Sequence, residues 1–160
     1  MMIIAVLIAQ ALLFSSGFST YFHQDDFIDL WLSRDWGQVI KAFNIFSPAS
    51  DFQFYRPISV QLYFFITKSL FGWNVLGYHV VTMAVLFTAG VLVYLLAKRI
   101  FKNKTIALLS MIFFALNPTH FAAANSAAYA HETLLVIFAI VSVYFLDLFA
   151  EHGKIKHLFF

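Results

Sequence analysis

The sequence has 160 residues, of which 62% are hydrophobic and only 11% are charged, and its formal net charge is +2. A soluble domain normally carries about a quarter charged residues, so this chain lacks the polar side chains that would cover a water-facing surface. Composition therefore excludes a soluble globular domain and indicates an integral membrane protein. The small net charge gives no reason to expect nucleic acid as a partner, and the absence of cysteine excludes disulfides and thiolate metal sites.

Long apolar intervals along the chain predict its membrane spans. Crossing the hydrocarbon layer takes about 20 apolar helical residues. We predict one all-α, polytopic domain over residues 1–160, with spans at about residues 2–20, 76–97, 105–122 and 133–150. The third span has a short apolar core and is expected to continue past Pro118 as a kinked or broken helix. The first span has no basic leader and is expected to be a retained signal anchor.

Basic residues predict which ends of the spans lie in the cytoplasm. One short connection without acids contains four of them, Lys98, Arg99, Lys102 and Lys104. The positive-inside rule places this connection in the cytoplasm, together with the amino terminus and with Lys154 and Lys156. The long loop 21–75 and the turn 118–132 are then predicted to lie outside, in a multi-pass protein of a bacterial inner (plasma) membrane or of the endoplasmic reticulum.

The loop 21–75 is predicted to carry two helices in the membrane interface. The stretch "DDFIDLWLSRDWGQVIKAF" begins with acids and has no helix breaker until Gly37, which predicts a helix capped by Asp25 or Asp26. The stretch "RPISVQLYFFITKSLF" begins with Pro57 at a natural first helical position. Both stretches are rich in aromatic residues, which favour the interface, and "NIFSPASDFQFY" between them is predicted to be a loop.

Polar residues that the spans do not need share the outer side of this topology. They are Asp25, Asp26, Arg56, His79, Asn117, His120, His131 and Glu132. Each also has a structural explanation, because Asp is a preferred helix cap, Arg pairs with acids or extends toward water, and His is at home at an interface. Their common layer, more than any single residue, indicates a site.

Four short motifs occur in a specific order along the chain. The acidic doublet follows the first span, "YRP" at residues 55–57 opens the second interfacial helix, "GYH" at 77–79 begins the second span, and "ALNPTH" at 115–120 ends the third. In this order they resemble the amino-terminal region of GT-C-fold membrane glycosyltransferases, nearest to the transmembrane tetratricopeptide-repeat O-mannosyltransferases and their bacterial relatives. The sequence departs from that pattern at Asn117 and Ala122, where the family often has His and Glu, and "AHETLL" only approximates its Gly-Arg-x-Asp-Leu-Leu.

The resemblance implies a glycosyltransferase that moves a mannose-like hexose from a polyprenyl-phosphate-linked donor to a hydroxyl of a protein, lipid or glycan acceptor on the extracytoplasmic side. The residues implied are Asp25 and Asp26 as catalytic base, Arg56, His79 and His120 as ligands of the donor phosphate, and His131 and Glu132 as further candidates. The resemblance implies no definite cofactor. A divalent metal held by His79, His120 and an Asp is the alternative, although no close His spacing supports it.

Two other classes of membrane protein stay open. A small transporter component would place its polar residues near the bilayer midplane, which here is apolar apart from the break at Pro118. A non-catalytic polytopic subunit would need no acidic doublet. Enzymes of the family that the chain resembles are much longer, so the chain is expected to be an amino-terminal fragment that is inactive alone.

Overall fold

The computed structural model describes residues 2–46 and 55–152, and this part of the chain is helical without any strand. Its helices are α1 (Met2–Leu13), η1 (Ser15–Ser19), α2 (Gln24–Leu32), α3 (Trp36–Ala42), η2 (Pro57–Leu62), α4 (Tyr63–Phe71), α5 (Val75–Phe101), α6 (Lys104–Ala115), α7 (His120–Asn125) and α8 (Ala130–His152). The all-α prediction is confirmed for these residues. Most of the predicted loop between the interfacial helices, together with Lys154 and Lys156, lies outside them.

In residues 2–46 and 55–152, two helices are long and apolar enough to cross a membrane. They are α5 and α8, and they cover the predicted spans 76–97 and 133–150. Helices α1 and α6 have only 12 residues each, fewer than the roughly 20 that a full crossing needs, so helix length does not confirm a count of four spans. The predicted break at Pro118 is confirmed, because α6 ends at Ala115 and α7 begins at His120.

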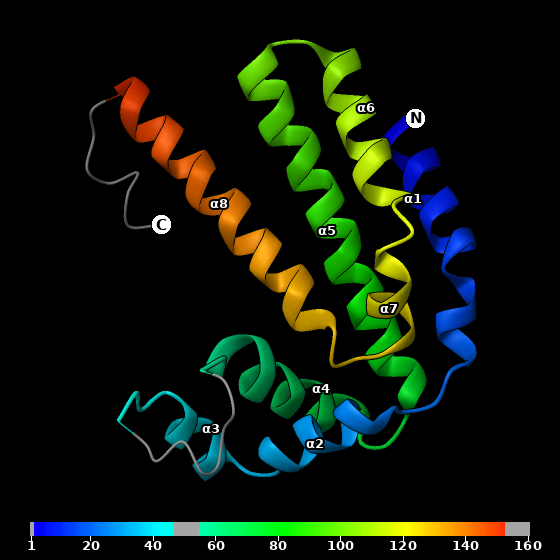
Figure 1. The fold of residues 1–160 in the computed structure, drawn as a ribbon, viewed down its shortest axis with the longest axis vertical. Helices are drawn as coiled ribbons and strands as arrows, with labels where there is room; N and C mark the ends of the chain where they lie inside the picture. Colours follow the sequence, from blue (N-terminus) through cyan, green and yellow to red (C-terminus); the bar gives the residue numbers. More distant parts are fainter. Residues whose placement is uncertain (1, 47–54, 153–160) are drawn as a thin grey trace.

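Helix α5 is the axis of the molecule (Figure 1). Helices α1 and α6 lie along one side of it, and α8 packs against its other side and diverges from it toward the α5–α6 connection. Helices α2, α3 and α4 lie across the opposite end, roughly perpendicular to the long helices. The start of α1 and the α5–α6 connection therefore share one end of the molecule, and the segment with α2 to α4 occupies the other.

The first part of the loop 21–75 folds differently from the prediction. The N-cap of α2 is His23, in an extended conformation, and neither Asp25 nor Asp26 is the cap. The helix also stops at Leu32, and α3 starts anew at Trp36 with Asp35 as its N-cap, whose carboxylate accepts a hydrogen bond from Gln38 N at 2.9 Å. Ser and Asp compete with helical hydrogen bonds, so the intervening "SRD" favours a turn.

The second helix predicted in the loop 21–75 begins where the sequence predicts it. Pro57 is the first residue of η2, a π-helical turn that runs directly into α4. A buried hydrogen bond of 2.9 Å between the hydroxyl groups of Tyr63 and Thr82 fixes α4 on α5. An apolar cluster that includes Phe22, Leu30 and Phe64 joins α2 and α4 to the start of α5.

A segment of small residues before α8 lets the backbone approach its neighbours closely. The stretch "AAANSAAYA" at 122–130 contains five buried alanines, Ala123, Ala124, Ala127, Ala128 and Ala130. Across from it, a Cβ added at Gly17 would lie 2.1 Å from the carbonyl oxygen of Ala124, so only glycine fits there. This packing brings the segment 126–131 beside the beginning of α2.

Candidate active site

The two aspartates of the acidic doublet have opposite environments. Asp26 is fully buried, with 0% of its surface exposed, whereas Asp25 is exposed. The Oδ1 atom of Asp26 accepts hydrogen bonds from Ser126 Oγ at 2.9 Å and from Ala128 N at 2.6 Å. Its Oδ2 atom accepts from His23 N at 2.7 Å. Asp26 therefore ties the start of α2 to the segment before α8, and Asp25 faces outward.

Backbone geometry explains why a carboxylate is stable in the Asp26 position. It lies in the first turn of α2 and also binds a backbone N–H just before α8 begins. Helix starts carry unpaired N–H groups and a partial positive charge, and both stabilise a carboxylate. A buried charge with three hydrogen bonds is consistent with a structural role for Asp26.

Arg56 and His131 form a pair beside the doublet. Arg56 precedes the first helical proline, and its Nη1 atom lies 2.8 Å from His131 Nε2. The Nδ1 atom of His131 donates to the carbonyl of Ala128, which leaves Nε2 as the acceptor for the guanidinium. Ala128 thus supplies its N–H to Asp26 and its carbonyl to His131, so one residue connects the buried aspartate with the arginine.

Asp29 belongs to the same group of charges, although the sequence analysis did not select it. It lies one turn after the doublet on α2 and is half-buried. Burial, together with the charges of Asp26 and Asp25, raises the pKa of Asp29 to about 7, and Arg56 acts in the opposite direction. Asp29 lies three residues after Asp26 and four after Asp25, and residues so spaced share a helix face. This spacing could have identified Asp29 from the sequence.

Five of these residues form what we call the acid–arginine cluster. They are Asp25, Asp29, Arg56, His131 and Glu132. Arg56, Glu132 and Asp25 all lie within electrostatic range of His131, and Asp25 and Arg56 lie within range of Asp29. The structure therefore brings together residues from α2, from the turn before η2 and from the start of α8.

Two other predicted residues have partners within the protein. His79 is buried, and its Nε2 atom lies 3.2 Å from both the hydroxyl and the carbonyl oxygen of Thr20. His120 lies 2.8 Å through Nε2 from the carbonyl oxygen of Phe114. In the described residues, no group of three His, Asp or Glu side chains is arranged to hold a metal ion.

Replacing Asp29 by Asn should change how stability depends on pH. Because the pKa of Asp29 is about 7 in the folded chain and 3.8 in the reference state, the unfolded chain loses this proton first as pH rises. The stability that the protonated carboxyl contributes is full below about pH 4 and is lost as pH rises through about 7. Melting temperatures in detergent at about pH 5 and pH 8 should therefore fall more for the wild type than for Asp29→Asn. Parallel behaviour of the two proteins would contradict this, and Asp35→Asn at an exposed cap is the control.

The fold and the cluster together define a helical membrane protein with a polar candidate site at one end of its long helices. A family model described as dolichyl-phosphate-mannose-protein mannosyltransferase matches residues 56–160, about two thirds of the chain. The chain belongs to this family. The matched part includes Arg56, His131 and Glu132, and the acidic doublet lies before it. No curated protein and no solved structure matches the chain.

Proposed function

We propose that the protein is a GT-C-type enzyme that transfers a mannose-like hexose from a polyprenyl-phosphate-linked donor to a hydroxyl of a protein, lipid or glycan acceptor. Membership in the mannosyltransferase family supports glycosyl transfer of this type. The observation that carries the assignment of residues is the division of the doublet. Asp26 is enclosed by three hydrogen bonds, and Asp25 is exposed beside Arg56 and His131.

In the proposed reaction, Asp25 accepts the proton of the acceptor hydroxyl as its oxygen bonds to the anomeric carbon of the sugar. The bond between that carbon and the phosphate oxygen breaks, and the polyprenyl phosphate leaves with the electron pair. Arg56 stabilises the charge of the leaving phosphate, since a guanidinium is a planar donor suited to phosphate oxygens. His131 orients Arg56 through their 2.8 Å hydrogen bond.

His79 and His120 remain predicted ligands of the donor phosphate. In the structure their Nε2 atoms lie within hydrogen-bond distance of oxygens of Thr20 and Phe114. Glu132 lies in the first turn of α8 next to His131, and its negative charge is proposed to act on the His131 ring.

The acid–arginine cluster is proposed to face the extracytoplasmic side. It lies at the end of the molecule with α2 to α4, opposite the α5–α6 connection (Figure 1). That connection carries Lys98, Arg99, Lys102 and Lys104, which the positive-inside rule places in the cytoplasm.

Labelling of single cysteines should report this orientation. The chain has no cysteine, and both Asn44 and Thr105 are exposed, the first after α3 and the second at the start of α6. In intact cells, an impermeant maleimide should label Asn44→Cys and should label Thr105→Cys only after the membrane is opened. Labelling of both variants in intact cells, or the reverse pattern, would contradict the proposed sidedness.

The reaction itself is tested with the protein expressed from its complete reading frame in membranes. Radiolabelled mannose on a polyprenyl phosphate should pass to an acceptor hydroxyl, and Arg56→Lys should weaken use of the donor about tenfold because it keeps the charge and loses the planar fork. If membranes containing correctly inserted protein transfer no sugar to any acceptor class, the chain is a non-catalytic subunit or a transporter component.

A further inference from the structure

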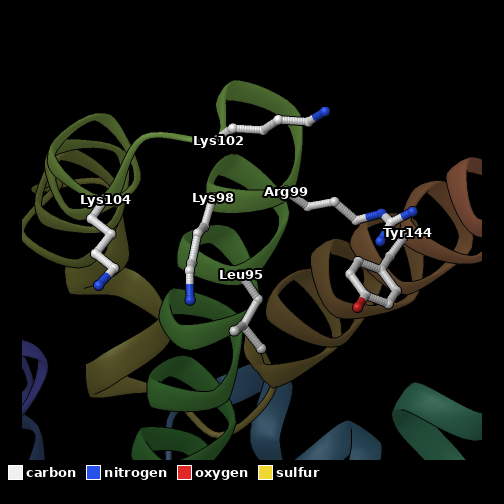
Figure 2. A pocket seen from close by; sticks show the side chains of 6 residues that line it. All are labelled: Leu95, Lys98, Arg99, Lys102, Lys104 and Tyr144. Carbon is white, nitrogen blue, oxygen red and sulfur yellow. The ribbon is translucent and has the colours of Figure 1, made fainter.

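A second polar feature lies at the opposite end of the molecule from the acid–arginine cluster. An open cavity of about 450 Å³ lies near the α5–α6 connection, where α8 diverges from α5. Its lining consists of Leu95, Lys98, Arg99, Lys102, Lys104 and Tyr144, as Figure 2 shows. We call it the basic pocket, and the proposed reaction makes no use of it.

Among the described residues 2–46 and 55–152, three of the four cations in the basic pocket have no ion pair. Arg99 bridges from α5 to Asp147 and Glu151 on α8, and its guanidinium lies 5.4 Å from the centre of the Tyr144 ring. The three lysines have no ion-pair partner among residues 2–46 and 55–152. One side of the pocket is therefore formed by Arg99, which two carboxylates hold in place, and the lining as a whole has a net positive charge.

The lysines are held around the opening by the geometry of the connection. Lys102 ends α5 in a left-handed conformation, with φ of 50°. The side chain of Asn103 then caps α6 by accepting from the N–H groups of Thr105 and Ile106. This tight turn places Lys98, on the last turns of α5, and Lys104, on the first turn of α6, beside the same cavity (Figure 2).

The wall of the pocket changes from charged to apolar within about one helical turn. Leu95 lies three residues before Lys98 on α5, and it faces the gap toward Tyr144 of α8 (Figure 2). A small anion such as free phosphate would use only the charged part of this lining. An anion with an apolar body attached would use both parts.

We propose that the basic pocket binds an anionic glycerophospholipid of the adjoining leaflet. The lysines of the lining supply positive charge for its phosphate, and the glycerol end of its acyl chains packs against Leu95 and Tyr144. Basic pockets between membrane helices suit such headgroups, and ammonium groups act as point charges that select the charge of the headgroup more than its shape. The assignment does not depend on the sugar transfer reaction.

Native mass spectrometry of the purified chain in a zwitterionic detergent tests this binding. Phosphatidylglycerol should be retained in preference to phosphatidylcholine with the same acyl chains. The triple variant with Gln at Lys98, Lys102 and Lys104 should lose on the order of tenfold or more in apparent affinity for phosphatidylglycerol. Retention of phosphatidylcholine should not change.

A second variant separates a shaped pocket from general attraction to positive charge. Leu95→Trp keeps every charge and fills the apolar part of the cavity, so it should also reduce retention of phosphatidylglycerol. The matched control replaces three cations at the other end of the molecule, Arg34, Lys41 and Lys68, by Gln and should retain the lipid as the wild type does.

Three outcomes would overturn the proposal. The first is an equal loss of phosphatidylglycerol in the control triple variant, and the second is unchanged retention by Leu95→Trp, whose charges are intact even if the lysine variant fails to fold. The third is displacement of the lipid by inorganic phosphate or glycerol 3-phosphate at equal concentration, which would identify a site for a free phosphate.

Discussion

Replacing Asp25 by Asn should lower sugar transfer by a factor on the order of 10² or more, the usual contribution of a positioned general base. The substitution keeps the size of the side chain and removes its ability to accept a proton from the attacking hydroxyl. Asp25 is exposed, so the variant should fold and insert normally. The measurement is the initial rate of mannose transfer from a polyprenyl phosphate donor, with the protein level in the membrane determined in parallel.

The control for this experiment is Asp35→Asn. Asp35 is an exposed aspartate whose side chain caps α3, and Asn caps a helix about as well as Asp. Transfer should therefore stay near the wild-type rate in this variant. Nearly normal transfer by Asp25→Asn would remove Asp25 from the role of base, and a fall in kcat with unchanged KM for the donor would support it.

The sequence predicted the helical class and the two long helices because both depend on composition alone. Both α5 and α8 contain an 18-residue stretch of high mean hydropathy with at most two charged residues, which predicts a membrane helix. It did not predict where α2 ends, because the restart of the helix at Asp35, whose side chain accepts a hydrogen bond from Gln38 N, differs from an uninterrupted helix by a small free energy. The short helices α1 and α6 show a related limit, because an apolar interval sets the hydrophobic length and does not fix where helical geometry stops.

Most residues of the candidate site were selected from the sequence, but the different environments of Asp25 and Asp26 were not predicted. Asp25 and Asp26 are adjacent and identical in chemistry, and only the fold shows that Asp26 is covered by the segment 126–128. That contact joins residues about 100 positions apart, as the separation of Asp26 from Ser126 shows, so no local pattern could reveal it. Asp29 was missed for a different reason: its spacing from the doublet is a local pattern, but its pKa near 7 comes mainly from burial in the fold, with a smaller part from the charges of Asp26 and Asp25.

Substitution of Asp26 should damage the fold more than it damages the chemistry. Three donors surround its two carboxylate oxygens, namely Ser126 Oγ, Ala128 N and His23 N. In Asp26→Asn one oxygen becomes an NH₂ group, so a donor faces a donor whichever way the amide is turned. A hydrogen bond to a charged group contributes about 1.5–3 kcal/mol, and a buried donor left unsatisfied costs a similar amount. We therefore expect a loss of about 2–4 kcal/mol in the free energy of unfolding.

Two further variants distinguish this structural role from a catalytic one. Ser126→Ala removes a single hydrogen bond to Asp26 and should cost about 1–2 kcal/mol, whereas Asp25→Asn on the exposed neighbour should stay within about 0.5 kcal/mol of the wild type. Unfolding in mixed detergent micelles gives these values. Because Ala128 connects Asp26 with His131 and Arg56, Asp26→Asn should also raise KM for the donor, and Ser126→Ala should raise it less. A stable Asp26→Asn protein with unchanged KM and a kcat lowered about 10²-fold would instead make Asp26 the base and Asp25 the bystander.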